Sequence, residues 1–125
     1  VQIGEGCNVS PNVAFAGEVI LKNDVTIGMG ATLHQGITIG SCSMIGMGAA
    51  VINNIPPFTT FAGMPAKKIK INEIKLKRLG VGVNLINLIK DVMIKDMPIR
   101  KIKLKTKDKK YFKILEDWVK KNNIS

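Results

Sequence analysis

The chain has 125 residues, of which 46% are hydrophobic, and a formal net charge of +10. This length allows one domain with an appendage, and the hydrophobic content is sufficient for a core. Residues 1–65 hold one basic and three acidic residues (net −2), whereas residues 66–125 hold eighteen basic and six acidic residues (net +12). The basic half indicates an acidic partner, which could be a phosphate-bearing ligand, an acidic protein, nucleic acid or a membrane surface.

A stretch of 42 residues between Asp24 and Lys67 carries no formal charge. Gly, Ser, Thr, Asn and Pro interrupt it every few residues, so the sequence predicts no membrane span. Two cysteines, Cys7 and Cys42, without a signal peptide are typical of a reduced cytoplasm, and we expect a cytoplasmic protein. Because the chain begins with Val1 in the middle of a repeat, we expect a fragment or a chain trimmed at its start.

A six-residue repeat dominates the first half. Large apolar side chains recur at Ile3, Val9, Phe15, Leu21, Ile27, Leu33, Ile39, Ile45 and Val51. A second set, mostly small or β-branched, follows four residues later at Cys7, Val13, Val19, Val25, Ala31, Ile37, Ser43 and Ala49. Two inward positions per hexad predict a stacked parallel β-helix over residues 1–57.

The repeat ends near Asn53-Asn54, and Pro56-Pro57 then removes two backbone donors from any further ladder. We therefore expect an exit loop over residues 58–71, with a turn around Gly63-Met64-Pro65-Ala66-Lys67. A basic α-helical domain is predicted to follow over residues 72–125.

Two or three helices are expected in that domain. The first runs from an Asn72 cap to a terminal Gly80. The second has an apolar stripe of Val83, Leu85, Ile86, Ile89, Val92 and Met93, and Pro98 is expected to end or interrupt it. The third, from Asp108 to about Asn122, places Tyr111, Phe112, Leu115, Trp118 and Val119 on one face. Lys101–Lys110 is predicted to be an exposed connection with mostly solvated charges.

These segments resemble the hexapeptide-repeat acyltransferases. The likeness runs from Ala31-Thr32-Leu33-His34-Gln35 through the hexads to Phe58, and continues in Gly63-Met64-Pro65-Ala66 and in Asn72 to Gly80. The His-Gln pair and the last segment are most similar to the UDP-N-acetylglucosamine O-acyltransferases of lipid A biosynthesis and their sugar N-acetyltransferase relatives. The resemblance implies a left-handed β-helix, a homotrimer and sites in clefts between neighbouring subunits.

The chemistry that the resemblance implies is attack of a sugar hydroxyl or amine on an acyl thioester, which needs a base and an oxyanion donor. Ala16-Gly17 matches the family's Ala-Gly pair, so Gly17 is the expected backbone oxyanion donor. The general-base histidine is expected about two residues upstream of Val1. Glu18 departs from the histidine usual beside that glycine, which leaves the acceptor sugar open.

The resemblance assigns four residues to substrate binding: His34, Gln35, Asn72 and Arg78. Taken alone, His34 reads as a solvated corner residue, and Asn72 and Arg78 as a helix cap and a surface cation. An arginine fork suits the paired oxygens of a diphosphate. Ile74 stands where the family often has Glu, so the nucleotide is less well defined.

Two further assignments concern the acyl donor. Met47, in a Gly-Met-Gly corner, reads alone as a flexible gap-filler and by resemblance as a border of the acyl-chain groove. Lys75 and Lys77 read alone as solvated cations and by resemblance as docking contacts for an acidic acyl carrier protein or for the phosphates of coenzyme A.

The leading hypothesis is an acyltransferase that moves an acyl group from acyl-acyl carrier protein to a UDP-linked aminosugar. An acetyl-CoA-dependent nucleotide-sugar N-acetyltransferase is the alternative, and a noncatalytic trimeric scaffold or binding module is an alternative of another class. No tightly bound cofactor and no metal are expected, since one histidine does not suit a zinc site. Nucleic-acid binding is disfavoured because no recognition motif accompanies the charge.

Overall fold

One short strand forms in every hexad of the first half. The computed structural model describes residues 1–122. The nine strands of the repeat are β1 (Gln2–Ile3), β2 (Asn8–Val9), β3 (Ala14–Phe15), β4 (Ile20–Leu21), β5 (Thr26–Ile27), β6 (Thr32–Leu33), β7 (Thr38–Ile39), β8 (Met44–Ile45) and β9 (Ala50–Val51). Each strand is only two residues long because the chain turns a corner after it.

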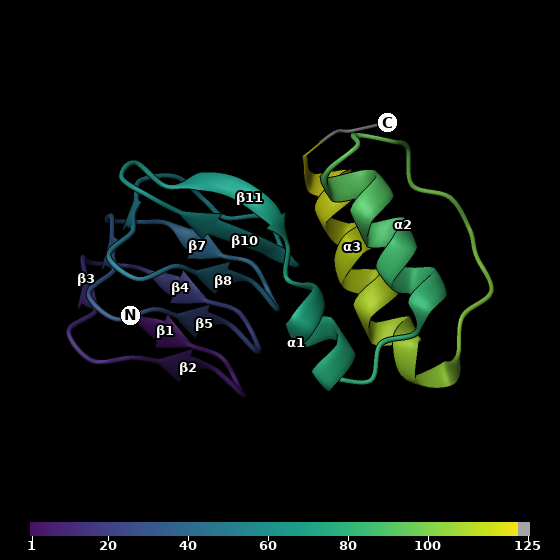
Figure 1. Ribbon diagram of the computed structural model, residues 1–125, viewed down its shortest axis with the longest axis horizontal. Coiled ribbons are helices and arrows are strands. Elements are labelled where there is room, and N and C mark those ends of the chain that lie inside the picture. Colours follow the sequence, from purple (N-terminus) through teal and green to yellow (C-terminus); the bar gives the residue numbers. More distant parts are fainter. Residues whose placement is uncertain (123–125) are drawn as a thin grey trace. The chain divides into compact units, whose positions relative to one another are not determined.

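The strands stack in parallel onto the strands of the next coil. Gln2 pairs with Ile20, an offset of 18 residues, and the other repeat strands keep the same offset. Three sheets result, with the orders β1-β4-β7, β11-β10-β8-β5-β2 and β3-β6-β9, in which β10 (Thr59–Ala62) and β11 (Lys67–Ile71) follow the repeat. Figure 1 shows the strands in successive layers. The predicted parallel β-helix is therefore confirmed, with three hexads per coil.

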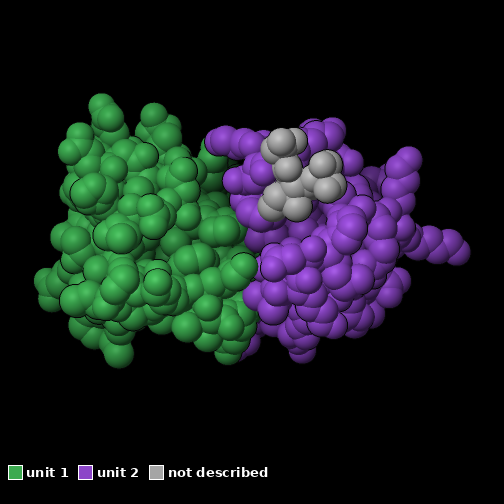
Figure 2. Space-filling model, turned by 90° about the horizontal axis from the view of Figure 1, so that it is seen from above, with its two compact units in different colours: residues 1–72 green, residues 73–125 purple. Residues whose placement is uncertain are grey.

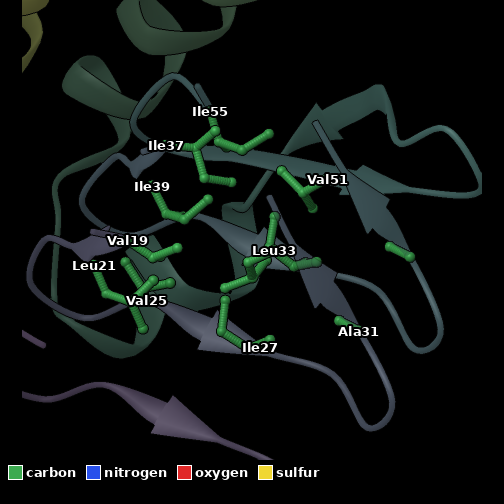
Figure 3. Close-up of a cluster of buried hydrophobic side chains, with 12 residues drawn as sticks. Val19, Leu21, Val25, Ile27, Ala31, Leu33, Ile37, Ile39, Val51 and Ile55 are labelled. Carbon is green, nitrogen blue, oxygen red and sulfur yellow. The ribbon is translucent and has the colours of Figure 1, made fainter. Parts of the chain in front are cut away.

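The inward residues of the repeat form the core of this unit. Figure 3 shows the side chains of the later coils pointing into a common interior, where Leu33, Ile39 and Val51 are at most 1% exposed. The first coil is more open, since Ile3 is 53% exposed while Val9 and Phe15 are only half-buried. The inward residues of the first coil are therefore less well buried than those of the later coils.

The expected exit loop over residues 58–71 is instead a hairpin, and that expectation was wrong for most of its length. Strand β10 (Thr59–Ala62) pairs in parallel with β8, so it adds another rung to the β-helix, and β11 (Lys67–Ile71) returns antiparallel to it. The Thr59 hydroxyl donates a hydrogen bond from Oγ1 to the Pro56 carbonyl oxygen at 2.7 Å. The predicted turn survives between the two strands.

Residues 1–72 form one compact unit, and a second begins at Glu73 (Figure 2). The second unit starts with α1 (Glu73–Arg78). Gly80 has φ of +78° and accepts the left-handed conformation that ends the helix. The N–H of Val81 donates to the Leu76 carbonyl and that of Gly80 to the Lys77 carbonyl, which is the Schellman arrangement. The predicted helix end at Gly80 is confirmed.

The other helices of this unit are α2 (Val83–Met93) and α3 (Lys109–Lys121), with a 3₁₀ turn η1 (Thr106–Asp108) before α3. The predicted apolar faces are buried at Leu85, Ile89, Leu115 and their neighbours, but Val83 is 69% exposed. Pro98 does not end α2, which stops five residues earlier, where the N–H of Ile94 still reaches the Lys90 carbonyl.

The N-termini of α2 and α3 lie at the same end of the pair. Both carboxylate oxygens of buried Asp108 accept hydrogen bonds from the Gly82 N–H, at 3.2 and 3.0 Å. The two helices therefore run in the same direction, and the connection between them has to return along their length, as Figure 1 shows.

Candidate functional site

One corner of the β-helix carries three of the residues that the sequence singled out. The N–H of Ala16 donates to the Leu33 carbonyl at 3.0 Å, and the N–H of Gly36 donates to the Gly17 carbonyl at 2.9 Å. His34 therefore lies one coil from Ala16, and Gln35 one coil from Gly17. Since stacked strands are about 4.7–4.9 Å apart, these residues share a small area of surface.

The side chains of His34 and Gln35 are exposed, as predicted for an outward corner. In the part of the chain that the structure describes, neither side chain forms a hydrogen bond. Only the backbone of His34 is engaged, through its N–H and the Val51 carbonyl at 2.9 Å. An imidazole and a carboxamide are thus presented side by side, with donors and acceptors available to a ligand.

Gly17 is exposed, and a Cβ built on it meets no atom within 4 Å. Its N–H has no hydrogen-bond acceptor within residues 1–122. The corner N–H groups of Met29 and Gln35 also have no acceptor within residues 1–122. A free N–H is what an oxyanion donor requires, and Gly17 shares this property with the other two corner residues. An oxyanion of the substrate could accept a hydrogen bond from such a free N–H.

His34 is the only histidine of the sequence. It is therefore the only imidazole that this chain can offer to a ligand or to a substrate. None of residues 1–125 matches the histidine that the resemblance expects as the base.

Met47 lies on a different corner from His34. The N–H of Gly48 donates to the Met29 carbonyl at 2.9 Å, which places Met47 one coil from Met29. Their side chains are 73% and 48% exposed. Within one chain, the corner with Gly17 and the corner with Met47 are separated by a face of the β-helix.

Met29 was missed by the sequence reasoning. It stands in Gly28-Met29-Gly30, which repeats Gly46-Met47-Gly48 after one full coil of 18 residues. A comparison of residues 18 apart, rather than six apart, would have paired the two methionines. Together they form an exposed apolar row along one corner, which we call the methionine row.

Asn72 is the last residue of the first unit and is 7% exposed. Its Nδ2 donates to the Cys42 carbonyl at 3.0 Å, and its backbone N–H donates to the Phe58 carbonyl at 2.7 Å. The side chain thus joins the hairpin strand end to the repeat. One of the two N–H donors of Nδ2 is used in this bond, and the carboxamide oxygen is the group that could accept a hydrogen bond from a ligand.

The cations predicted to contact ligands lie on α1, in the second unit. Lys77 pairs with Glu73 at 2.9 Å, and Lys90 of α2 binds the other carboxylate oxygen at 2.6 Å. Hydrogen bonds from Lys77 and Lys90 lower the pKa of Glu73 from 4.5 to about 2. Lys75 is half-buried and Arg78 is exposed, and within residues 1–122 neither forms an ion pair.

Residues 1–122 contain neither a metal-binding cluster nor a membrane-spanning helix. No cluster of three or more His, Cys, Asp or Glu side chains there could hold a metal ion. None of the helices in that range combines the length and apolar character that a bilayer crossing requires.

The sequence is similar to known acyl- and acetyltransferases, although no protein-family model matches it. It is 35% identical over 89 residues to an acyl-[acyl-carrier-protein]–UDP-N-acetylglucosamine O-acyltransferase from Paraburkholderia phymatum, which covers 71% of this chain and 34% of the relative. It is 42% identical over 67 residues to a serine acetyltransferase from Buchnera aphidicola, covering 54% and 24%. The chain thus spans about a third or less of the length of these curated relatives.

Solved structures show the same architecture. An Arabidopsis UDP-N-acetylglucosamine acyltransferase matches with a TM-score of 0.74 at 22% identity, covering 98% of this chain and 41% of that one. A galactoside acetyltransferase in complex with coenzyme A matches with a TM-score of 0.56 at 28% identity, covering 60% and 46%. The fold is the expected left-handed parallel β-helix with a C-terminal helical appendage.

Proposed function

Because this chain is a hexapeptide-repeat β-helix similar in sequence to acyltransferases, we propose that it takes part in acyl transfer from acyl-acyl carrier protein to a UDP-linked aminosugar. The proposal rests on the corner of the β-helix that holds Gly17, His34 and Gln35. It combines an unused amide donor, an imidazole and a carboxamide on adjacent coils.

In this proposal each residue has one role. Gly17 stabilises the oxyanion of the tetrahedral intermediate through its N–H. His34 and Gln35 bind the acceptor sugar, while Asn72, through its carboxamide oxygen, and Arg78 bind the nucleotide. Lys75 and Lys77 dock the acidic carrier protein. The base of the reaction is assigned to none of residues 1–125.

The separation of the two corners supports a homotrimer. Gly17 and Met47 lie on different corners of one chain, so a single β-helix does not present both at the same corner. If neighbouring subunits pack side by side, the Gly17 corner of one can face the methionine row of the next. The proposed site is therefore formed between subunits.

The second candidate is transfer of an acetyl group from acetyl-CoA. The serine acetyltransferase relative, at 42% identity over 67 residues, favours this alternative. The same corner chemistry would serve both reactions, because a thioester carbonyl is attacked in each. The two candidates differ in the donor that the protein binds.

Binding measurements on the 125-residue chain test the proposal without requiring a base. Isothermal titration calorimetry with UDP-N-acetylglucosamine is expected to show binding that weakens about fivefold in His34→Ala or Gln35→Ala, since each loses about one hydrogen bond. Asn8→Ala, exposed on β2 in the sheet that does not border this corner, is the matched control and should bind normally.

Titrations with the two donors decide between the candidates. Binding of acyl-acyl carrier protein that is lost in the double variant Lys75→Glu, Lys77→Glu supports the leading proposal. Binding of coenzyme A in place of the carrier protein supports the acetyltransferase. A trimer that binds neither a nucleotide sugar nor a donor would contradict both and favour a noncatalytic scaffold.

We further propose that Met47 limits the length of the acyl chain. Its exposed side chain lies beside Met29 and would fill space along the acyl groove. Met47→Gly should shift preference toward longer acyl groups, by roughly tenfold for two extra methylenes at about 0.8 kcal/mol each. Competition binding among acyl-acyl carrier proteins of different length measures this, and equal preference in both proteins would contradict it.

A further inference from the structure

The connection between α2 and α3 contains a strand-like segment with a regular charge pattern, which we call the lysine segment (residues 99–105, Ile-Arg-Lys-Ile-Lys-Leu-Lys). It belongs to no helix or strand and shows no bend along its length. From residue 101 onward, exposed lysines alternate with half-buried Ile102 and Leu104. This is the period of two that an extended strand shows on a half-buried surface.

The backbone of the lysine segment lacks hydrogen-bond partners. Within the described residues, the N–H and C=O groups of residues 99–104 form no hydrogen bond, and the carbonyl of Lys105 accepts one from the Asp108 N–H at 2.9 Å. Nearly all backbone groups in folded proteins pair with other groups or with water. This segment therefore presents a row of donors and acceptors like that of an uncovered sheet edge.

The segment is nevertheless held in place at both ends. Nη2 of Arg100 contacts the Asp91 carboxylate at 3.1 Å, and the N–H of Met97 donates to the Asp91 carbonyl at 2.9 Å. At the other end, η1 and buried Asp108 fix the chain to the start of α2. An extended segment that is already ordered loses less conformational entropy when a ligand binds.

The lysines of the segment have no acidic neighbour to neutralise them. Lys101, Lys103 and Lys105 are exposed and form no ion pair within residues 1–122. In an extended chain, side chains two residues apart are about 6.6–6.8 Å apart on the same face. A partner strand with carboxylates at every second residue would match this spacing, and opposite charges across strands are favourable.

We propose that the lysine segment binds an extended acidic peptide by adding it as a neighbouring strand. The peptide's backbone would satisfy the unpaired groups of residues 99–104, and its alternate Glu or Asp side chains would pair with Lys101, Lys103 and Lys105. Nucleic acid fits less well, because the segment offers no aromatic side chain for base stacking. An anionic membrane would pair with the lysines but not with the backbone. This inference does not rest on the proposed acyl transfer.

The test uses the full chain and a fluorescent synthetic peptide of alternating glutamate and threonine, followed by fluorescence anisotropy. Binding is expected to weaken at least tenfold in the triple variant Lys101→Glu, Lys103→Glu, Lys105→Glu. The matched control Lys109→Glu, Lys120→Glu, Lys121→Glu makes the same change of charge at exposed positions of α3 and should change binding no more than about twofold. Circular dichroism checks that both variants keep their helices.

A second peptide separates strand addition from charge attraction alone. N-methylation of alternate residues removes backbone donors and leaves every carboxylate in place, so it should also weaken binding at least tenfold. Equal binding of the methylated peptide would overturn the proposal. It would likewise be overturned by no binding of either peptide, or by tighter binding to phosphatidylglycerol vesicles or to a single-stranded oligonucleotide than to the acidic peptide.

Discussion

Every sixth residue of the repeat adopts a left-handed backbone conformation. Positive φ values recur at Gly6, Asn12, Glu18, Asp24, Gly30, Gly36, Cys42 and Gly48. The conformation is needed at the second residue of each corner, and only glycine adopts it without a steric cost of about 1–2 kcal/mol. Glycine is therefore the residue expected at this slot, and the other residue types carry some strain.

Two glycines on one corner separate this backbone effect from side-chain packing. A Cβ on either Gly17 or Gly36 would meet nothing within 4 Å, but only Gly36 has a positive φ, of +76°. Gly36→Ala should destabilise the first unit by about 1 kcal/mol, whereas Gly17→Ala should be neutral or slightly stabilising. Urea unfolding of the β-helix measures both. Equal destabilisation would mean that Gly17 is also conformationally constrained.

Glu73 predicts an acid dependence of the second unit. Its two lysine hydrogen bonds lower its pKa to about 2 from an ordinary 4.5. Since the pKa is lowered by folding, the stabilisation is complete above pH 4.5 and is lost as the pH falls toward 2. The stability difference between the natural chain and Glu73→Gln should therefore shrink between pH 5 and pH 3.

The measurement is urea unfolding followed by the fluorescence of Trp118, the single tryptophan of the chain. Glu116→Gln serves as the control, because Glu116 forms no ion pair in the described part of the chain. A difference for Glu73→Gln that stays constant over this range would show that the two lysine contacts do not form in solution.

At the scale of elements, Asp108 joins two helices rather than capping its own. Its carboxylate accepts from the Gly82 N–H at the positive end of α2, and it forms no side-chain cap on α3. Asp108→Ala would leave that N–H without its acceptor and should cost about 1–3 kcal/mol. Asp117→Ala, which removes only a surface contact to Lys113, should cost less than about 1 kcal/mol. Equal losses in urea unfolding would contradict this role.

The elements differed in how far the sequence could predict them. The coils could be predicted, because the two buried positions of each hexad indicate where its strand lies and that this strand stacks on a strand of the next coil. Strand β10 was not, since Thr59, Thr60, Phe61 and Ala62 leave the six-residue spacing and become a rung only by pairing with β8. Pro98 did not predict the end of α2, because the helix already stops at Met93 and a left-handed residue, Asp96 with φ of +54°, precedes the proline.

The candidate site was predictable in part for a similar reason. The outward exposure of His34, Gln35 and Met47 follows from the slot that each occupies in its hexad. The stacking of Gln35 on Gly17 and of Met47 on Met29 required the 18-residue coil, which the hexad alone does not give. The hydrogen bond from Asn72 to the Cys42 carbonyl joins residues 30 positions apart, and no local sequence pattern predicts such a contact.

At the scale of the whole molecule, charge divides the chain as sharply as structure does. Residues 1–72 hold four basic and three acidic residues (net +1), whereas residues 73–125 hold fifteen basic and six acidic residues (net +9). Like charges at this density repel, so screening should stabilise the second unit. Salt also weakens the surface ion pairs of that unit, but each contributes only about 0–1 kcal/mol.

Raising the salt concentration should therefore raise the Tm reported by Trp118 in α3. In a unit of this size, about 1 kcal/mol corresponds to roughly 4–8 °C. The β-helix is nearly neutral, so hydrogen exchange of its strand amides should change little over the same range. Parallel shifts in both probes would mean that the two units unfold as one cooperative body. A fall in the Tm reported by Trp118 would mean that the ion pairs stabilise the unit by more than the net repulsion destabilises it. The lysine segment would then be less available to an acidic partner than its exposure indicates.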